Sequence, residues 1–309
     1  MQEVPTMDRH VVAGVDGTAA SLAAAHWAAR EAQRRGVPLR LVHVWQWSPR
    51  PAASVPLGTT QVGWAARTLD GEVGSVRAAH PGLQIDGELV KADSTVSALA
   101  EAAADADLMV LGSHGLGGFT GFVLGSVSQR VVARSPRPVV LVRAGQAPAG
   151  EHLPAVDGVS PEEIPETPYR DVVLGLDTRR PCDELIEFAF ESARRRDARL
   201  HVIHVFSASS ELTEDSRPEP VPGPELLAAQ ERTVVATLRP WCEKFPGVPV
   251  VETVAEGRVT AELVRASTGA SLVVVGRRTR DGRLGSHIGP VTHAVLHHVG
   301  CPVAVVPHN

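Results

Sequence analysis

Short apolar runs alternate with longer amphipathic stretches along both halves of the chain. The runs are rich in β-branched residues and bounded by Gly or Pro, which predicts buried strands. In the first half they cover residues 10–15, 39–45, 83–90, 107–111 and 138–142. Helical spacing is clear in one stretch of each half: Val96, Leu99, Ala100 and Ala103, and Leu185, Phe188, Ala189 and Ser192. The pattern predicts an α/β fold in which each half is an open five-stranded parallel sheet with helices on both faces.

The two halves repeat one pattern. His10–Asp16 matches Asp171–Asp177, and the run at 38–45 matches the run at 199–206, both at an offset of 161 residues. Toward the ends, 107–112 matches 271–276 and 138–142 matches 302–306, at an offset of 164. A period of this length indicates a duplicated domain and not a solenoid of short repeats.

The segment from Gly145 to Tyr169 joins the halves. It contains several prolines and no apolar periodicity, so we expect an extended linker. Its acidic residues are Glu151, Asp157, Glu162, Glu163 and Glu166, and it has no Lys or Arg. The sequence therefore predicts domains at 8–144 and 170–307 with a Pro-rich acidic linker at 145–169. The linker carries as much negative charge as the whole chain, whose net charge is −5, so the two domains together are formally neutral.

Charge and composition exclude several classes of partner. A net charge of −5 and an aromatic content of 4% argue against a nucleic-acid-binding surface, which needs basic patches and base-stacking rings. No apolar run approaches the length of a membrane span, and the N-terminus lacks the pattern of a signal peptide. Cys182, Cys242 and Cys301 are far apart and form no C-x-x-C pair, so we expect a cytoplasmic protein without disulfides.

A glycine-rich loop follows the run at 107–111. It extends from Gly112 to Gly125, and a helical segment begins near Val127. Glycines allow a ligand to approach the backbone closely, and free N–H groups at a helix N-terminus bind anions. Ser126 and Ser128 could add hydroxyl donors. The loop therefore predicts a phosphate site, although a bare glycine-rich loop is also compatible with a flexible surface segment. There is no G-x4-G-K-[ST] motif, and Asp16-Gly17-Thr18 replaces the G-x-G-x-x-G turn of dinucleotide-binding folds.

The loop has a more specific pattern, Gly112-x2-Gly115-x9-Gly125-Ser126, which resembles the ATP-binding members of the universal stress protein family. The resemblance covers residues 8–143 and includes Val12–Thr18, Leu41–Val44 and the stretch from Gly125 to Val140. The whole chain is thus similar to a tandem universal stress protein. The resemblance implies two Rossmann-like domains of the adenine nucleotide alpha hydrolase-like type.

The resemblance also implies ligand roles in the first half. Asp16, with Gly14 and Val15, would meet the adenosine, and the backbone of Val44 would meet the adenine edge. Gly112, His114 and Gly115 would surround the ribose and phosphates. Gly125, Ser126, Val127 and Ser128 would bind phosphates. The ligand implied is ATP, which Mg²⁺ could accompany. Without the loop, Asp16 would be read as a simple turn or cap, and His114 as a solvated loop residue.

The second half departs from this pattern. Asp177, Val205, Gly276 and Gly289 occupy matching positions, but Thr279 replaces the inner glycine and Pro290 replaces the serine. Proline lacks the N–H that a phosphate needs there, and the Cβ of Thr279 resists a positive φ. Arg277, Arg278, Arg280 and Arg283 could supply charge instead, or form a solvated basic loop. We therefore expect one intact site and one degenerate site.

Histidines give no firm site. His293 and His297 have a spacing that can hold a metal, but no third ligand is fixed by the sequence, so no metal site is predicted. His43 and His204 lie in matching strands and are interpreted as hydrogen-bonded core residues. No carboxylate pair or Ser/His/Asp set is placed to cleave ATP, so no catalytic residue is assigned.

Three functions remain open at this point. The first is an ATP-binding stress-response protein that acts by regulation or binding and is not an enzyme. The second is a pseudo-dimeric interaction module with vestigial nucleotide binding, and the third is a weak ATPase. The expected partners are an adenine nucleotide, the other domain of the same chain and a second copy in a homodimer, with no nucleic acid and no membrane.

Overall fold

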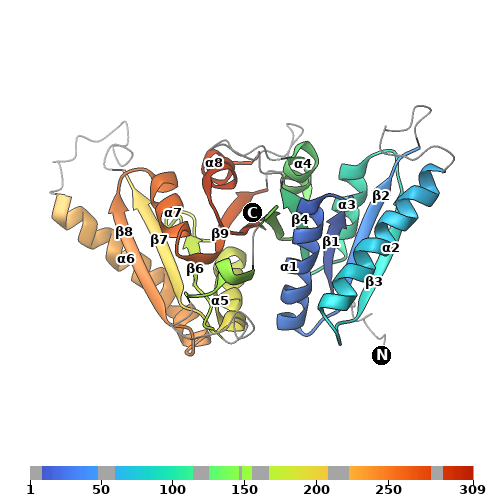
Figure 1. Cartoon of the computed structure of the whole chain (residues 1–309). Coiled ribbons are helices and arrows are strands. Elements are labelled where there is room, and N and C mark those ends of the chain that lie inside the picture. The colour runs from blue at the N-terminus through green and yellow to red at the C-terminus, as the bar shows by residue number, and fades with distance from the viewer. Residues whose placement is uncertain are drawn as a thin grey trace, which may run out of the picture. The chain divides into compact units, whose positions relative to one another are not determined.

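The computed structural model of the chain (Figure 1) describes residues 9–47, 60–113, 125–145, 148–154, 167–207, 223–279 and 288–308. Its contacts divide the chain into two compact units. Unit 1 contains Met1–Gln146, and unit 2 contains Ala147–Asp281 and Gly289–Asn309. None of the described helices is long and apolar enough to cross a membrane.

Unit 1 is a parallel sheet with the strand order β3-β2-β1-β4-β5. Its strands are β1 (Val11–Val15), β2 (Leu39–Trp45), β3 (Ile85–Lys91), β4 (Leu108–Ser113) and β5 (Val139–Arg143). Its helices are α1 (Ala19–Arg35), α2 (Gln61–Ala79), α3 (Thr95–Ala104) and α4 (Ser126–Arg134). Helices α1 and α2 cover one face, and α3 and α4 cover the other (Figure 1). The central strands are buried on both faces, which is why they are continuously apolar in sequence.

Unit 2 repeats this sheet with the order β10-β9-β6-β7-β8. Its strands are β6 (Asp171–Gly175), β7 (Leu200–Phe206), β8 (Val250–Glu256), β9 (Ala270–Arg278) and β10 (Val303–His308). Its helices are α5 (Asp183–Arg196), α6 (Gly223–Lys244), α7 (Val259–Ser267) and α8 (Pro290–His298). The predicted fold class, two open five-stranded parallel sheets with helices on both faces, is confirmed.

The segment between the sheets is more ordered at its ends than the expected extended linker. Pro148–Glu151 forms a 3-10 helix, η1, and the next residues pair with the chain just before β6. Leu153 N donates to Pro168 O at 2.8 Å, and Arg170 N donates to Glu151 O at 2.9 Å. The rings of His152 and Tyr169 pack with their centroids 4.0 Å apart. Backbone pairing and ring contact thus close the segment into a loop. Its centre, residues 155–166, lies outside the described part of the chain.

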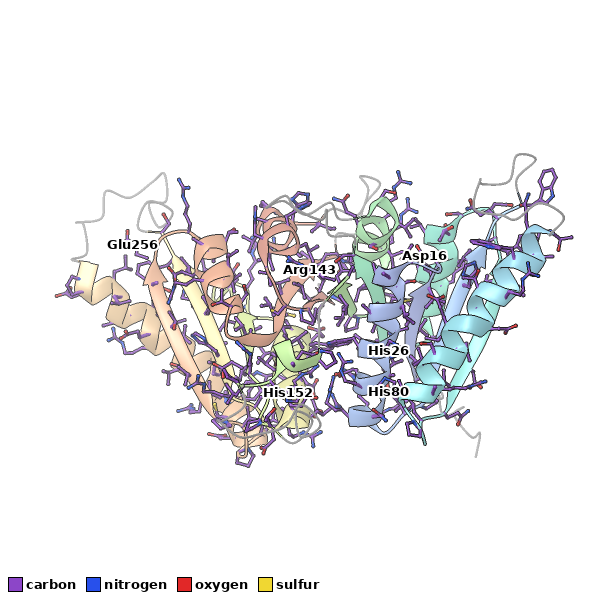
Figure 2. All side chains as sticks on the ribbon, in the orientation of Figure 1. Asp16, His26, His80, Arg143, His152 and Glu256 are labelled. Atoms are coloured by element: carbon purple, nitrogen blue, oxygen red, sulfur yellow. The ribbon has the colours of Figure 1, made fainter. Side chains whose placement is uncertain are left out.

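Two histidines join α1 to α2 in unit 1. His26 Nδ1 lies 3.3 Å from His80 Nε2, so one ring must be neutral for the two nitrogens to share a proton. Burial lowers the pKa of His26, and Arg30 lowers it further. Burial, His26 and Arg30 lower the pKa of His80 to about 4. Figure 2 shows His26 on α1 and His80 at the end of α2, both below Asp16 in the view.

This pair predicts acid sensitivity of unit 1. Between the ordinary pKa of 6.5 and about 4, the unfolded chain binds more protons than the folded chain, so stability falls as the pH drops through this range. We expect the melting temperature of the wild-type protein to fall between pH 7 and pH 5, and that of His80→Gln to fall less. Thermal unfolding of both proteins at each pH provides the measurement. Part of the pH dependence of the melting temperature should remain in His80→Gln, because burial also lowers the pKa values of His43 and His201. An equal fall in both proteins would refute the assignment to His80.

Candidate functional site

A pocket of about 260 Å³ lies at the carboxyl ends of the strands in unit 1. The strand order reverses between β1 and β4, and the pocket opens at these two strands. Open α/β sheets bind ligands at such a switch point, because the loops that leave its two strands diverge to opposite faces. The fold therefore supplies a cleft where the sequence analysis places the ligand.

The predicted site residues of the first half converge on this pocket. Those that line it are Gly14, Val15, Asp16, Val44, Gly112, Gly125, Ser126, Val127 and Ser128. They come from the ends of β1, β2 and β4 and from the start of α4. The other two, His114 and Gly115, lie outside the described residues. Positions as distant in sequence as Gly14 and Ser128 are thus brought together by the sheet.

Further lining residues were not predicted. They are Thr18, Ala20, Ser21, Val42, Thr95, Leu99 and Leu111. Val42 could have been found, because it lies two residues before Val44 on β2 and side chains alternate across a strand. Thr95 and Leu99 belong to α3, and no local signal in the sequence connects them with the glycine loop. Together these residues give the pocket an apolar wall beside a few polar groups, the composition typical of ligand sites.

The turn after β1 holds the Asp16 carboxylate in a defined orientation. Its Oδ1 accepts hydrogen bonds from Thr18 N at 3.1 Å and from Thr18 Oγ1 at 2.7 Å. Thr18 Oγ1 also accepts from Ser21 N at 3.2 Å, so the same side chain caps α1. Gly17 has a φ of +83°, which favours glycine. Asp16 itself is exposed at the pocket, where Figure 2 shows it near the end of β1.

The start of α4 forms the other polar wall. Gly125 is its N-cap and provides no side-chain hydrogen bond. The N–H groups of Ser126, Val127 and Ser128 belong to the first turn, where a helix has no internal acceptors for them. Such N–H groups, with the positive end of the helix dipole, attract anions. The pocket therefore joins a carboxylate acceptor on one side to anion-binding donors on the other.

The Ser128 hydroxyl has a different role from the one expected. It donates to Gly112 O at 3.0 Å and is almost fully buried. In unit 2, Thr292 Oγ1 donates to Gly276 O at 2.8 Å in the same way. This bond ties the end of the fourth strand to the helix that follows the glycine loop. It commits the hydroxyl hydrogen to a carbonyl, so only the backbone N–H of Ser128 remains suited to a phosphate.

The second unit differs most at its acidic turn. Asp177 Oδ1 accepts from Arg179 N at 3.1 Å, but α5 begins only at Asp183, whereas α1 begins three residues after Asp16. Pro181 and Cys182 take the place of the first turn of the helix. Asp177 is therefore not supported by a helix start as Asp16 is, a difference that the identical Asp did not reveal.

The remaining candidate positions of unit 2 fall in its regular elements. Val205 lies on β7, Gly276 on β9, and Gly289 is the N-cap of α8 with Pro290 directly after it. A Cβ on Gly276 would come within 2.7 Å of His308 Nε2, so the His308 ring packs against this glycine. Arg277 is buried, and burial lowers its pKa. Arg280 and Arg283 lie outside the described part of the chain.

No group of three metal-ligating side chains occurs among the described residues. His293 and His297 pack with their ring centroids 4.4 Å apart on α8. His204 is held as a core residue, with Nδ1 3.0 Å from Leu176 O and Nε2 3.1 Å from Gln230 Oε1.

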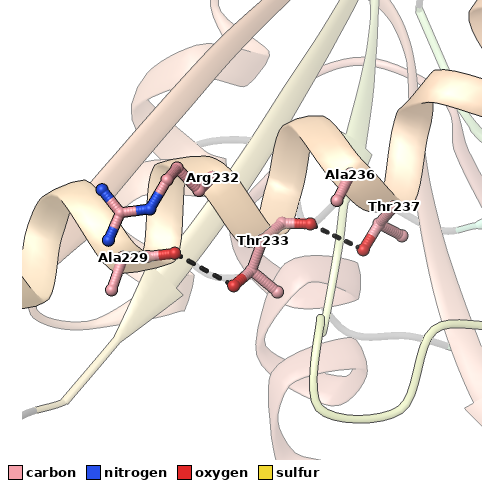
Figure 3. Close-up of a pocket in the computed structure, with 5 residues that line it drawn as sticks. All are labelled: Ala229, Arg232, Thr233, Ala236 and Thr237. Atoms are coloured by element: carbon pink, nitrogen blue, oxygen red, sulfur yellow. Dashed lines mark hydrogen bonds between the residues drawn. The ribbon is translucent and has the colours of Figure 1, made fainter.

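A second hollow lies on α6 and lacks the features of a binding site (Figure 3). It is lined by Ala229, Arg232, Thr233, Ala236 and Thr237. The threonine hydroxyls donate to carbonyl groups one turn earlier on the same helix, Thr233 to Ala229 and Thr237 to Thr233. They are thus turned back onto their own backbone, and the hollow is a shallow part of an exposed helix face.

The family model and two similar curated relatives point to the same protein family. The model of the universal stress protein family matches residues 7–143 and again 168–307. Universal stress protein Rv2005c of Mycobacterium tuberculosis is 32% identical over 97% of this chain and 98% of its own length. Universal stress protein Rv2623 of the same organism is 31% identical over 96% of this chain and 95% of its own length.

Solved structures share the fold over nearly the whole chain. A universal stress protein from Archaeoglobus fulgidus aligns with a TM-score of 0.66 and 17% identity, covering 98% of this chain and 99% of the other. A putative universal stress protein from Pseudomonas aeruginosa aligns with a TM-score of 0.60 and 17% identity, covering 98% and 95%. At this identity the likeness concerns the fold.

Proposed function

The chain belongs to the universal stress protein family, a family of the stress response, and we propose that its first unit binds ATP as a regulatory ligand. The observation that carries this proposal is the convergence of the described site residues of unit 1 on one pocket at the switch point of the sheet. The pocket combines an apolar wall, a carboxylate and an uncapped helix N-terminus, which together match a base, a ribose and phosphates.

The chemistry of each wall suits one part of the nucleotide. Val42, Val44, Leu99 and Leu111 offer apolar contact to a purine ring. Asp16 can accept hydrogen bonds from ribose hydroxyls, since Thr18 engages only one of its two oxygens. The first turn of α4 offers N–H groups to phosphate oxygens. The volume of about 260 Å³ lies just below the roughly 300–1,000 Å³ of ligand pockets, so we expect the phosphates to extend out along α4.

The site favours binding over turnover. Asp16 is the one titratable side chain among the described lining residues, so this part of the pocket holds no acid–base pair. Mg²⁺, if it accompanies ATP, would be bound mainly through phosphate oxygens and water, with Asp16 as the nearest carboxylate in the described wall. We therefore propose a nucleotide-binding regulatory protein and not an enzyme.

Nucleotide content tests this proposal directly. The purified protein is denatured, and its supernatant is assayed for adenine nucleotides, followed by calorimetric titration of nucleotide-free protein with ATP. We expect about one nucleotide per chain, since Pro290 and the shifted start of α5 impair the second unit. Two per chain would contradict the interpretation of unit 2, and no nucleotide together with no binding of added ATP would refute the proposal. Steady release of phosphate from ATP would favour the ATPase alternative.

A further inference from the structure

A buried carboxyl group lies directly behind the Asp16 turn. Glu72 is on α2 and is only 7% exposed. Its Oε1 lies 2.9 Å from Ser21 Oγ on α1, a buried contact between residues 51 positions apart. Ser21 lines the nucleotide pocket, whereas Glu72 does not. Burial of a carboxyl group costs free energy unless the group is hydrogen-bonded, so the partners of Glu72 determine whether its burial is tolerated.

Ser21 links Glu72 to the backbone of the turn. Its Oγ accepts a hydrogen bond from Asp16 N at 3.2 Å and lies 2.9 Å from Thr18 O. A hydroxyl has one hydrogen and two lone pairs, and a carbonyl oxygen can only accept. All three contacts are hydrogen bonds at once only if Ser21 donates to Thr18 O and a protonated Glu72 donates to Ser21. An ionised Glu72 would compete with Thr18 O for the single hydroxyl hydrogen.

Helix α2 also touches the turn one helical turn before Glu72. A Cβ on Gly17 would come within 2.8 Å of Thr68 Cγ2, so the turn lies against α2 with no room for a side chain. The helix thus supports the turn at two points, by packing at Thr68 and through hydrogen bonds at Glu72. This arrangement fixes the backbone from which the Asp16 carboxylate projects into the pocket.

The surroundings of Glu72 favour its neutral form, mainly through burial. Burial raises the pKa of Glu72, and the Asp16 charge adds to this, while the hydrogen bonds with Ser21 and with the Gly17 backbone oppose the rise. The other titratable group at the turn is His43 on β2. Burial lowers its pKa, and Asp16 and the Val15 carbonyl oppose that shift. A neutral Glu72 avoids a second negative charge beside Asp16.

We infer that Glu72 is a positioning residue of the nucleotide site, which in its protonated form acts through Ser21 to hold the Asp16 turn in its binding geometry. This inference rests on the proposed function of unit 1. Unit 2 lacks the device, because Cys182 stands at the position of Ser21 and its Sγ accepts from Leu185 N within α5. The network is therefore confined to the unit that has the pocket.

Nucleotide affinity of two Glu72 variants across pH provides the test. Glu72→Gln keeps the shape and can donate to Ser21 at every pH, whereas Glu72→Ala removes the donor. As rising pH ionises Glu72, we expect wild-type protein to bind ATP progressively more weakly than Glu72→Gln, by roughly three- to ten-fold once Glu72 is ionised. Titration of the ATP phosphates cancels, because both proteins are compared with the same ligand at each pH. The exposed Glu101, on α3, provides the control Glu101→Gln, which should follow the wild type.

A double-mutant cycle separates action through Ser21 from simple packing. Glu72→Ala and Ser21→Ala should each weaken binding, and the double variant should be no weaker than the weaker single variant, because both remove one chain of bonds. Hydrogen exchange of peptides covering Asp16–Thr18 should quicken in Glu72→Ala and remain slow in Glu72→Gln, a readout independent of ligand.

The outcomes distinguish this inference from the proposed function. If the wild type binds ATP but both Glu72 variants match it at every pH, the inference is overturned and the proposed function stands. Equal weakening of ATP binding in Glu72→Gln and Glu72→Ala, or additive effects in the cycle, would show that Glu72 acts only by packing. Either result would also overturn the inference. If the wild type binds no nucleotide, both fail together.

Discussion

Asp16→Ala should weaken ATP binding about 30-fold while the protein remains folded. The carboxylate is exposed at the pocket, and one of its oxygens is free of the Thr18 contacts that orient it. Hydrogen bonds that involve a charged group contribute about 1.5–3 kcal/mol, and a loss of about 2 kcal/mol corresponds to this change in Kd. Isothermal titration calorimetry with ATP measures the effect, and circular dichroism checks the fold.

Two matched variants identify the cause of the expected loss of ATP affinity. Asp16→Asn retains an acceptor for Thr18, so it removes the charge while keeping the turn, and it should lose less affinity than Asp16→Ala. Asp177→Ala changes the corresponding residue of unit 2 and should leave the affinity unchanged. Equal effects of Asp16→Ala and Asp177→Ala would show that the two units share the ligand, and unchanged affinity in folded Asp16→Ala would refute the assigned site.

Gly112→Ala should destabilise unit 1 by about 3 kcal/mol, the upper part of the range for forced overpacking. A Cβ at this position would lie 2.6 Å from both the carbonyl carbon and oxygen of Ala20, and 2.8 Å from Ser21 N. These are backbone atoms in the first turn of α1, which cannot move aside as a flexible side chain can. The shift would also disturb the Ser128 bond to Gly112 O.

Denaturant unfolding followed by tryptophan fluorescence measures this loss, because Trp27, Trp45, Trp47 and Trp64 all belong to unit 1. Gly74→Ala is the matched control. Gly74 is an exposed helical position on α2 with nothing within 4 Å of an added Cβ, so this change should stabilise the unit by about 0.5–1 kcal/mol. A Gly112→Ala protein as stable as the wild type would show that α1 can move away from β4.

Much of the fold follows from local pattern. The buried parallel strands appear as continuous β-branched runs, since both faces of each strand are covered, and β2 occupies the residues predicted for it. The predicted ends of the strands were less accurate. β4 continues through Gly112 and Ser113, because its pairing with β5 extends two residues into the glycine loop. Pairing partners, and not local propensity, decide where a strand stops.

The candidate site was likewise predictable only in part. The family resemblance assigned Asp16, Val44, Gly112 and Gly125–Ser128 to the site, and all of them line the pocket at the switch point. The use of the Ser128 hydroxyl was not predictable, because its acceptor is the carbonyl of a residue on a different element. Unit 2 has Asp177 where unit 1 has Asp16, and this match did not reveal that α5 begins later than α1.

By itself, the sequence determined that one α/β domain is present twice, and it predicted that the first copy alone keeps the full glycine-loop pattern. These features are carried by residues close together in the chain, or repeated at a constant offset. The tertiary structure alone decided which side chains stand behind the Asp16 turn. Glu72 meets Ser21 across 51 residues because α1 and α2 pack side by side on one face of the sheet. The environment of a buried carboxyl group depends on such packing, so only the folded chain places Glu72 beside Ser21.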